Sequence, residues 1–127
     1  MIRIPKEYDS RRQAISRALT QVNDDYFQLQ QLGISLVADP GQDSFCFSYA
    51  MGEGKTQKDI DALENTNDPD KGDILIYTND SGIRCHAGIY YNQHDMVVSK
   101  WESHPVFMHH MFMVPIEYGT RIEFYKR

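Results

Sequence analysis

The chain has 127 residues, a length that suits one compact domain and leaves little room for a second. Hydrophobic residues make up 41% of it and charged residues 24%, which is enough apolar material to build a core. The net charge is −5, and Lys and Arg form no stripe that could neutralise phosphates, so nucleic acid is excluded as a partner. We therefore expect a single globular domain over residues 1–127.

The sequence also bears on the compartment. No apolar run approaches the roughly 18 residues of a membrane span, so we expect no membrane partner. The segment Met1 to Ser10 is mixed and charged, unlike a signal peptide, which predicts synthesis in the cytoplasm and an export route, if any, without a cleavable signal. Two cysteines, Cys46 and Cys85, are too few for a disulfide scaffold and would be free thiols in a reducing compartment.

The first third of the chain predicts a scaffold helix. Asp9 or Ser10 is suited to cap it, and apolar residues follow at helical spacing as far as Val22. The pattern extends toward Leu32, with Gly33 as a stop, and residues 23–25 leave open whether it is interrupted. Residues 34–37 then read as a short strand and residues 39–41 as a turn.

A short helix is predicted next, with Cys46 in its first turn. Asp43 or Ser44 can cap it, the middle is apolar, and Gly52 ends it. Residues 53–71 are polar and predict a connecting loop with one helical turn over residues 58–63.

From Gly72 onward the hydrophobic period changes to two, which indicates strands separated by short turns. We expect an α+β fold in which N-terminal helices pack on a C-terminal antiparallel sheet of about five strands. The expected strands are residues 73–77, 83–91, 96–101, 106–108 and 121–125.

Cys46 is the first candidate for chemistry. A thiol attacks a carbonyl only as thiolate, and a helix amino terminus lowers the pKa of a thiol through its unpaired N–H groups and dipole. A cysteine in an apolar helix is more often a small core residue, so Cys46 needs a partner to be interpreted as a nucleophile.

The strand around His86 supplies that partner. Alternation places Ile83, Cys85, Ala87, Ile89 and Tyr91 on one apolar face that should pack on the helices. The other face presents His86 beside Gly88, and the glycine is expected to leave room for a substrate next to a general base. The same assignment makes Cys85 an unreactive core thiol.

The order of these motifs resembles the NlpC/P60 and CHAP families of papain-like cysteine peptidases. It runs from a cysteine that opens a helix, through the strand Gly72-Asp73-Ile74-Leu75-Ile76-Tyr77, to His86-Ala87-Gly88-Ile89-Tyr90. The resemblance covers residues 45–125, and the His86 segment is its most specific part. The cysteine motif departs from the family form, since Phe45-Cys46-Phe47-Ser48-Tyr49 stands where Asp-Cys-Ser-Gly-Phe is usual.

The resemblance implies a papain-like core and hydrolysis of an amide bond by Cys46 and His86 through a thioester. It further implies a peptide-like substrate, often a bacterial cell-wall peptide. We expect neither cofactor nor metal. Whether an inhibitor or immunity protein binds the cleft is left open by the sequence. A phosphate-binding loop at residues 52–56, a calcium loop at residues 68–73 and a zinc site at His104, His109 and His110 all lack the required spacing.

The family uses a third polar residue, one strand after the histidine, to orient the imidazole. Hairpin pairing across residues 92–95 places Val97, Ser99 and Trp101 on the His86 side, which makes Ser99 the first choice. Glu102 and His109 are the alternatives if the turn differs. A weak third residue leaves open a second hypothesis, in which the same scaffold is a catalytically silent binding module.

Overall fold

The computed structural model describes residues 1–20, 26–38, 45–92 and 94–127. Its fold is α+β, as the sequence predicts, and the described strands form one sheet with antiparallel pairing throughout. The α-helices are α1 (Asp9–Leu19), α2 (Phe27–Gln31) and α3 (Cys46–Met51), and the 3-10 turns are η1 (Lys6–Tyr8), η2 (Gln57–Ala62) and η3 (Ile116–Tyr118). The strands are β1 (Ile2–Arg3), β2 (Ser35–Ala38), β3 (Asn65–Thr66), β4 (Ile74–Thr78), β5 (Arg84–Asn92), β6 (Met96–Lys100), β7 (Val106–His110) and β8 (Arg121–Tyr125).

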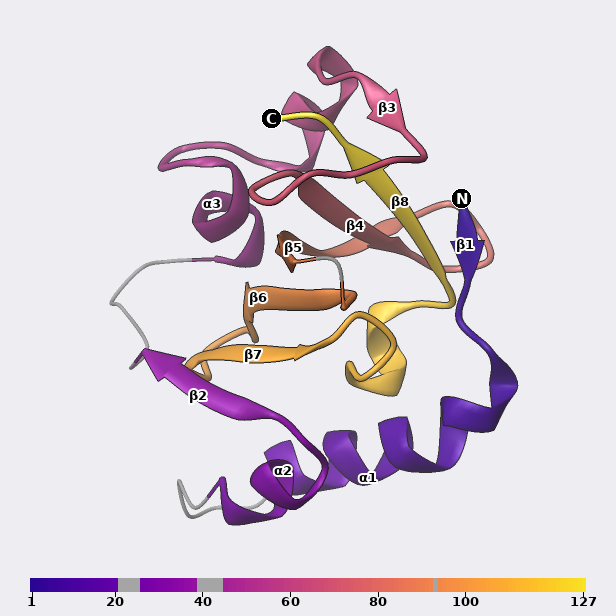
Figure 1. The fold of residues 1–127 in the computed structure, drawn as a ribbon, viewed down its shortest axis with the longest axis vertical. Coiled ribbons are helices and arrows are strands. Elements are labelled where there is room, and N and C mark those ends of the chain that lie inside the picture. Colours follow the sequence, from indigo (N-terminus) through magenta and orange to yellow (C-terminus); the bar gives the residue numbers. More distant parts are fainter. Residues whose placement is uncertain (21–25, 39–44, 93) are drawn as a thin grey trace.

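The sheet holds eight strands among the described residues, more than the predicted five (Figure 1). Its order is β1-β8-β4-β5-β6-β7-β2, and β3 pairs with β8 off this path. The five strands expected from the alternation are all present. The additional β1 and β3 have two residues each, too short for an alternating pattern, and the N-terminal β2 joins the sheet beside β7.

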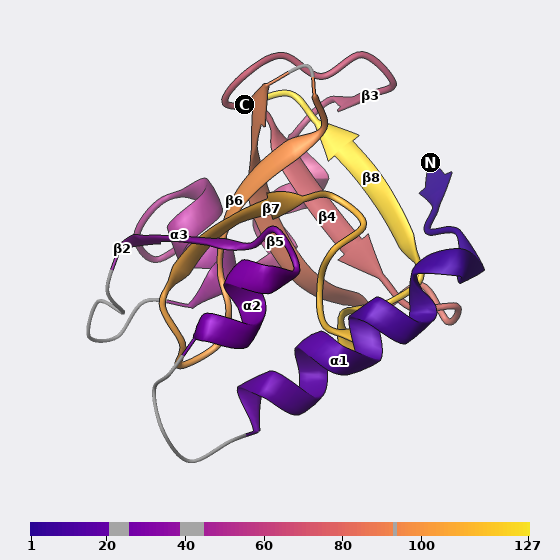
Figure 2. The same ribbon diagram turned by 60° about the horizontal axis from the view of Figure 1, so that its bottom comes forward.

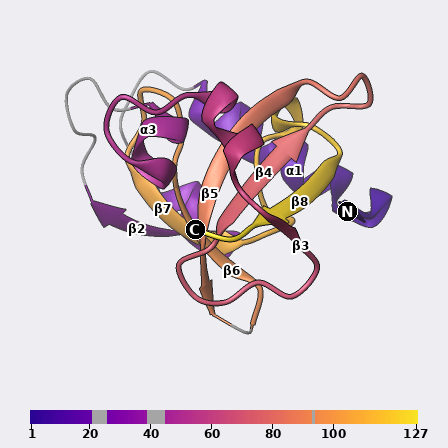
Figure 3. The ribbon, with the colours of Figure 1, turned by 90° about the horizontal axis from the view of Figure 1, so that it is seen from above.

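The sheet separates two apolar cores, because side chains alternate between its faces. The larger core gathers Leu75 and Tyr77 of β4 with Ile15 of α1 and Leu29 of α2. Figure 2 shows α1 and α2 lying together on that side of the molecule. The smaller core joins Ala50 of α3 and residues of η2 to the opposite face of β4 and β5, and Figure 3 shows α3 from above.

The helix starts differ slightly from the predicted ones. Helix α1 begins at Asp9, with Tyr8 in the capping position after the turn η1, so Asp9 is the first helical residue rather than the cap. The predicted turn at residues 39–41 and the helix caps Asp43 and Ser44 lie outside the described residues, as does the segment 21–25 between α1 and α2. The helices of the described residues are all too short or too polar to cross a bilayer.

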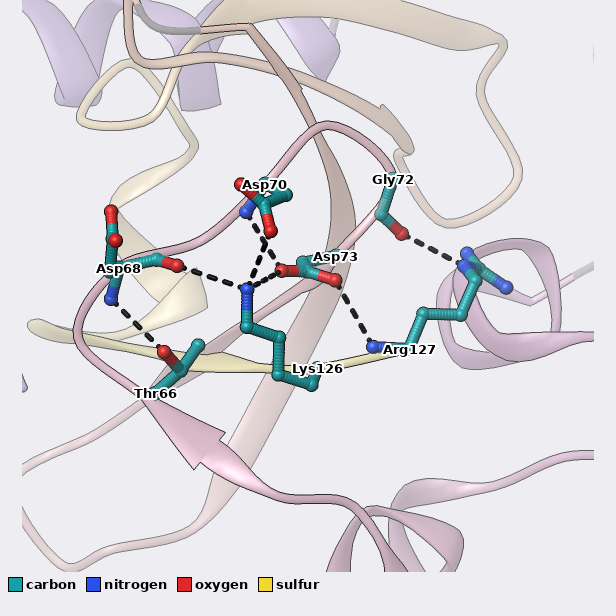
Figure 4. A network of polar contacts seen from close by, with 7 residues as sticks. All are labelled: Thr66, Asp68, Asp70, Gly72, Asp73, Lys126 and Arg127. Atoms are coloured by element: carbon teal, nitrogen blue, oxygen red, sulfur yellow. Dashed lines mark hydrogen bonds and ion pairs between the residues drawn. The ribbon is translucent and has the colours of Figure 1, made fainter.

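The C-terminal end of the chain is tied to the loop before β4. Lys126 Nζ lies 2.9 Å from Asp70 Oδ2 and 3.1 Å from Asp73 Oδ2, and it donates to the carbonyl oxygen of Asp68 (Figure 4). The backbone N–H of Arg127 donates to Asp73 Oδ1 at 3.1 Å. Asp73 is buried, so its carboxylate is the centre of this network.

Candidate active site

Helix α3 presents Cys46 as its first residue, as the sequence predicts. Phe45 precedes the helix in an extended conformation, and the first helical hydrogen bond runs from Tyr49 N–H to Phe45 O at 2.8 Å. The helix ends at Gly52, whose φ of 120° is a conformation that favours glycine. Cys46 therefore lies at the turn where the chain enters the helix.

Burial dominates the electrostatics of Cys46. It raises the pKa of the thiol, while backbone N–H groups, first that of Ala87 and then those of Phe47 and Cys46, act in the opposite direction. The net shift is upward, contrary to the sequence expectation of a lowered pKa. The physical reason is that a six-residue helix has a small dipole, which desolvation of the thiolate outweighs.

His86 lies on β5, paired with Tyr77 of β4, and its side chain enters the larger core. The imidazole stacks on Tyr118, with ring centroids 4.1 Å apart and an interplanar angle of 18°. Burial, followed by the neighbouring His109, lowers the pKa of His86 well below its ordinary value. The imidazole is therefore neutral at pH 7.

Gly88 does not leave the expected space beside His86. A Cβ built on Gly88 would lie 2.6 Å from Val97 Cγ1 and 3.2 Å from Ser99 Cβ. The glycine is thus needed for the close approach of β6, and the space beside the base is filled by protein. The predicted substrate space at this position is wrong, because alternation does not show what covers a face.

The other face of β5 follows the prediction only in its middle. Ala87 and Ile89 pack in the smaller core near α3, but Ile83 is 60% exposed and Tyr91 is 37% exposed. Cys85 is half-buried and its thiol donates to the carbonyl oxygen of Ile83 at 3.3 Å. The β4–β5 register shifts between Tyr77 and Thr78, opposite this cysteine, so Cys85 lies at an irregularity and not in the core.

Cys46 lies beside β5, next to the residue that follows His86. Helix α3 covers the Ala87 face and the imidazole lies on the opposite face. The residues of β5 that pair with β6 are Ile89, Tyr90 and Asn92. Ala87 precedes this paired segment, and its backbone N–H lies beside the sulfur of Cys46. Among the described residues, no hydrogen bond joins the sulfur to the imidazole, and their direct contact stays a prediction.

Ser99 lies on the predicted side of β6, but its hydroxyl is engaged elsewhere. The Trp101 indole N–H donates to Ser99 Oγ at 2.9 Å, and Ser99 Oγ lies 2.7 Å from His109 Nε2. His109 Nδ1 faces the carbonyl oxygen of His110 at 2.8 Å, so Nδ1 carries the proton and Nε2 accepts from Ser99. In the described part of the chain, neither Ser99 nor His109 hydrogen-bonds to His86.

Glu102, the remaining alternative for the third role, is exposed and has a φ of 53°. Its charge raises the pKa of both Cys46 and Tyr118, although burial is the larger cause for each. Glu102 therefore lies within electrostatic reach of the sulfur. Its carboxylate makes no hydrogen bond to His86 among the residues that the structure describes.

Two residues near Cys46 were not identified from the sequence. Lys100 is 2% exposed and donates to the carbonyl oxygens of Glu102 and His104. Tyr118 stacks on His86, and its pKa is raised by burial and then by the charges of Glu102 and Cys46. A lysine is rarely buried, and Tyr118 is distant from His86 in the chain, so no local pattern pointed to either.

The described residues contain no cluster of three or more His, Cys, Asp or Glu side chains placed to hold a metal ion. Comparison of the chain with protein-family models, curated proteins and solved structures found no match.

Proposed function

We propose that this chain is a cysteine hydrolase that cleaves an amide bond, with Cys46 as nucleophile and His86 as general base. The proposal includes a papain-like core of the NlpC/P60 kind. The observation that carries it is the position of the sulfur beside the backbone N–H of Ala87, the residue that follows His86. The cysteine that begins α3 thus lies one residue along β5 from the histidine. The proposal requires the imidazole to reach the sulfur at the edge of that strand.

The resting pair would be neutral, since burial raises the pKa of the thiol and lowers that of the imidazole. The thiol proton then passes to an imidazole nitrogen as the sulfur attacks the carbonyl carbon. His86 returns this proton to the leaving amine as the C–N bond breaks, which leaves a thioester. A water molecule, deprotonated by His86, attacks the thioester, releases the carboxylic acid and restores the thiol.

The N–H groups of Cys46 and Phe47 precede the helical hydrogen-bond ladder and lie beside the sulfur. They supply donors for the oxyanion that forms when the carbonyl carbon becomes tetrahedral. Bacterial cell-wall peptides are the substrate class proposed, on the resemblance of the cysteine, Gly-Asp and histidine motifs alone.

The test is turnover of purified cell-wall peptides and a panel of simple amides by four proteins. Wild type and Cys85→Ala should cleave the same substrate at similar rates, because Cys85 is the matched thiol outside the site. Cys46→Ala and His86→Gln should lose activity by about 10²-fold or more. Turnover retained in Cys46→Ala, or absent from wild type on every substrate, contradicts the proposal.

A second candidate, a catalytically silent binding module on the same scaffold, is favoured by one observation. The pKa shifts of Cys46 and His86 move away from each other, which disfavours a thiolate–imidazolium pair. Alkylation by iodoacetamide in a Cys85→Ala background separates the two candidates. In a hydrolase, His86→Gln slows the alkylation of Cys46, because the base assists removal of the thiol proton. In a silent module the same substitution leaves the alkylation rate unchanged.

A further inference from the structure

The orientation of the His86 imidazole is set by aromatic rings. Tyr118 lies parallel to it at 4.1 Å between centroids, and Tyr77 lies at 5.5 Å with an angle of 45°. His86 Nε2 is buried and has no hydrogen-bond partner among the described residues. A neutral imidazole whose proton is not fixed by an acceptor must be held by packing. Here the ring stacked on the imidazole is that of Tyr118.

Tyr118 is in turn fixed by a buried arginine. Arg12 of α1 is 2% exposed, and its guanidinium donates to three carbonyl oxygens of the loop that carries Tyr118. The acceptors are Val114 at 3.0 Å, Pro115 at 3.0 Å and Gly119 at 2.6 Å. These carbonyl groups lie on both sides of Tyr118 in the sequence. The guanidinium of Arg12 therefore binds the loop before and after Tyr118.

A second contact from α1 acts on the same loop. The backbone N–H of Ile116 donates to Ser16 Oγ at 3.0 Å, and Ser16 Oγ donates to Glu117 at 2.7 Å. Gly119 closes the loop against β4, where an added Cβ would lie 2.3 Å from the carbonyl oxygen of Thr78. The loop is therefore held between α1 and the sheet, and Tyr118 has little freedom to move.

We propose that Tyr118 is the positioning residue of His86, and that Arg12 locks it in place through the loop of residues 114–119. Tyr118 takes, by stacking, the role that a hydrogen-bonding third residue has in the family that the chain resembles. This inference rests on the proposed function for its catalytic meaning. Its structural content, the control of the imidazole by Tyr118, is measurable without turnover.

The stack has a chemical consequence for the base. A ring held in one plane presents its nitrogens in fixed directions, which reduces the number of conformations to be sampled before proton transfer from the thiol. The stack also keeps water from the ring, consistent with a neutral base of low pKa. A hydroxyl or carboxylate acceptor would instead favour the imidazolium, so the two ways of orienting a histidine predict different protonation behaviour.

The experiment uses the full chain with ¹⁵N-labelled histidine and records the ring nitrogen signals of His86 together with kcat and KM. Tyr118→Phe keeps the stacking ring and should leave the His86 tautomer unchanged and kcat within about threefold. Tyr118→Leu removes the ring; the His86 signals should broaden or show both tautomers. The same variant should lower kcat at least about tenfold with little change in KM.

A matched control is available in a second tyrosine–histidine stack outside the site. Tyr8 stacks on His110 with centroids 6.2 Å apart and an angle of 8°. Tyr8→Leu should leave the His86 signals and kcat unchanged. If Tyr118→Leu does not fold, as judged by urea unfolding, Tyr118→Met replaces it with the same expected result, because the longer, unbranched methionine side chain adapts better to an irregular gap.

The outcomes separate this inference from the proposed function. A folded Tyr118→Leu or Tyr118→Met protein with wild-type His86 signals overturns the positioning role. If wild type shows no turnover but Tyr118→Leu alters the His86 signals, the positioning role is supported and the hydrolase is contradicted. Arg12→Gln should produce a weaker form of the same change in the His86 signals, because Tyr118 is still present but its loop loses the hydrogen bonds to the guanidinium. Unchanged His86 signals in this variant would overturn the role of Arg12.

Discussion

Three histidines on strands β5 and β7, which flank β6, have pKa values below that of a free imidazole, with burial as the main cause. They are His86 on β5 and His109 and His110 on β7, and the pKa of His109 is lowered to about 4. Burial disfavours the protonated form of a histidine, so protonation of these residues favours the unfolded chain, in which they are solvated. The stability of the protein therefore depends on pH through these residues.

The sign of that dependence follows from the direction of the shifts. The unfolded chain binds protons near pH 6.5, while folded His86 and His109 bind them only at lower pH. The stabilisation is fully present above pH 6.5 and is lost as pH falls toward 4. We expect the free energy of unfolding to fall by up to about 1.4 kcal/mol per pH unit for each of the two residues.

Substitution of His109 tests this dependence. Urea unfolding of wild type and His109→Gln between pH 7 and pH 4.5 should show a smaller pH slope in the variant, by about one proton. Ser99→Ala is the matched control, because it breaks the same hydrogen bond but keeps the imidazole. Equal slopes for wild type and His109→Gln would show that His109 titrates as freely in the folded chain as in the unfolded one.

At the scale of the elements, the β5–β6 hairpin has one close contact that requires a glycine. Gly88 lies against the side chains of Val97 and Ser99, and no larger residue fits without a shift. The alternation of β5 correctly placed His86 and Gly88 on one face. It did not show that this face is closed by β6, so the glycine serves packing and not substrate access.

Gly88→Ala should therefore destabilise the protein by about 1–3 kcal/mol, the usual range for overpacking. Val97→Ala removes the methyl group that an alanine at position 88 would meet at 2.6 Å. The double variant should recover part of the loss, and a double-mutant cycle from urea unfolding measures this recovery. Strict additivity of the two single substitutions would mean that the strands separate to accept the methyl group.

At the scale of the whole molecule, the C-terminal end of β8 is held to the loop before β4 by Asp73. Burial alone would raise the pKa of this carboxyl group, but backbone N–H groups of Asp70 and Arg127 and the ammonium of Lys126 outweigh it. The net shift is downward. The stabilisation is present above the unfolded pKa near 4 and is lost as pH falls through the lower folded value.

Asp73→Asn and Asp70→Asn form a matched pair, since both remove a carboxylate that contacts Lys126. The side chain of Asp73 is 9% exposed and that of Asp70 is 83% exposed. Asp73→Asn should cost about 1–3 kcal/mol and Asp70→Asn less than about 0.5 kcal/mol at pH 7, measured by urea unfolding. Equal costs would contradict the view that the buried hydrogen bonds of Asp73, and not the surface charge pair, hold the end of the chain.

The sequence by itself determined the elements whose signals are local. Alternation located β4 to β8 to within a few residues, and the apolar run before Gly52 placed Cys46 at the start of α3. These features depend on neighbouring residues, because side-chain direction repeats every two residues in a strand and about every 3.6 in a helix. Strands β1 and β3 could not be predicted in this way, because two residues are too few to show an alternating pattern.

Only the tertiary structure decided what each face meets. Alternation puts His86 and Gly88 on one face, but the folding of β6 and of the loop before β8 determines that Tyr118 covers the imidazole and Val97 approaches the glycine. The same holds for Arg12, whose three carbonyl partners lie near the other end of the chain. Contacts between distant segments arise from the packing of the sheet and α1, and no local period in the sequence encodes them.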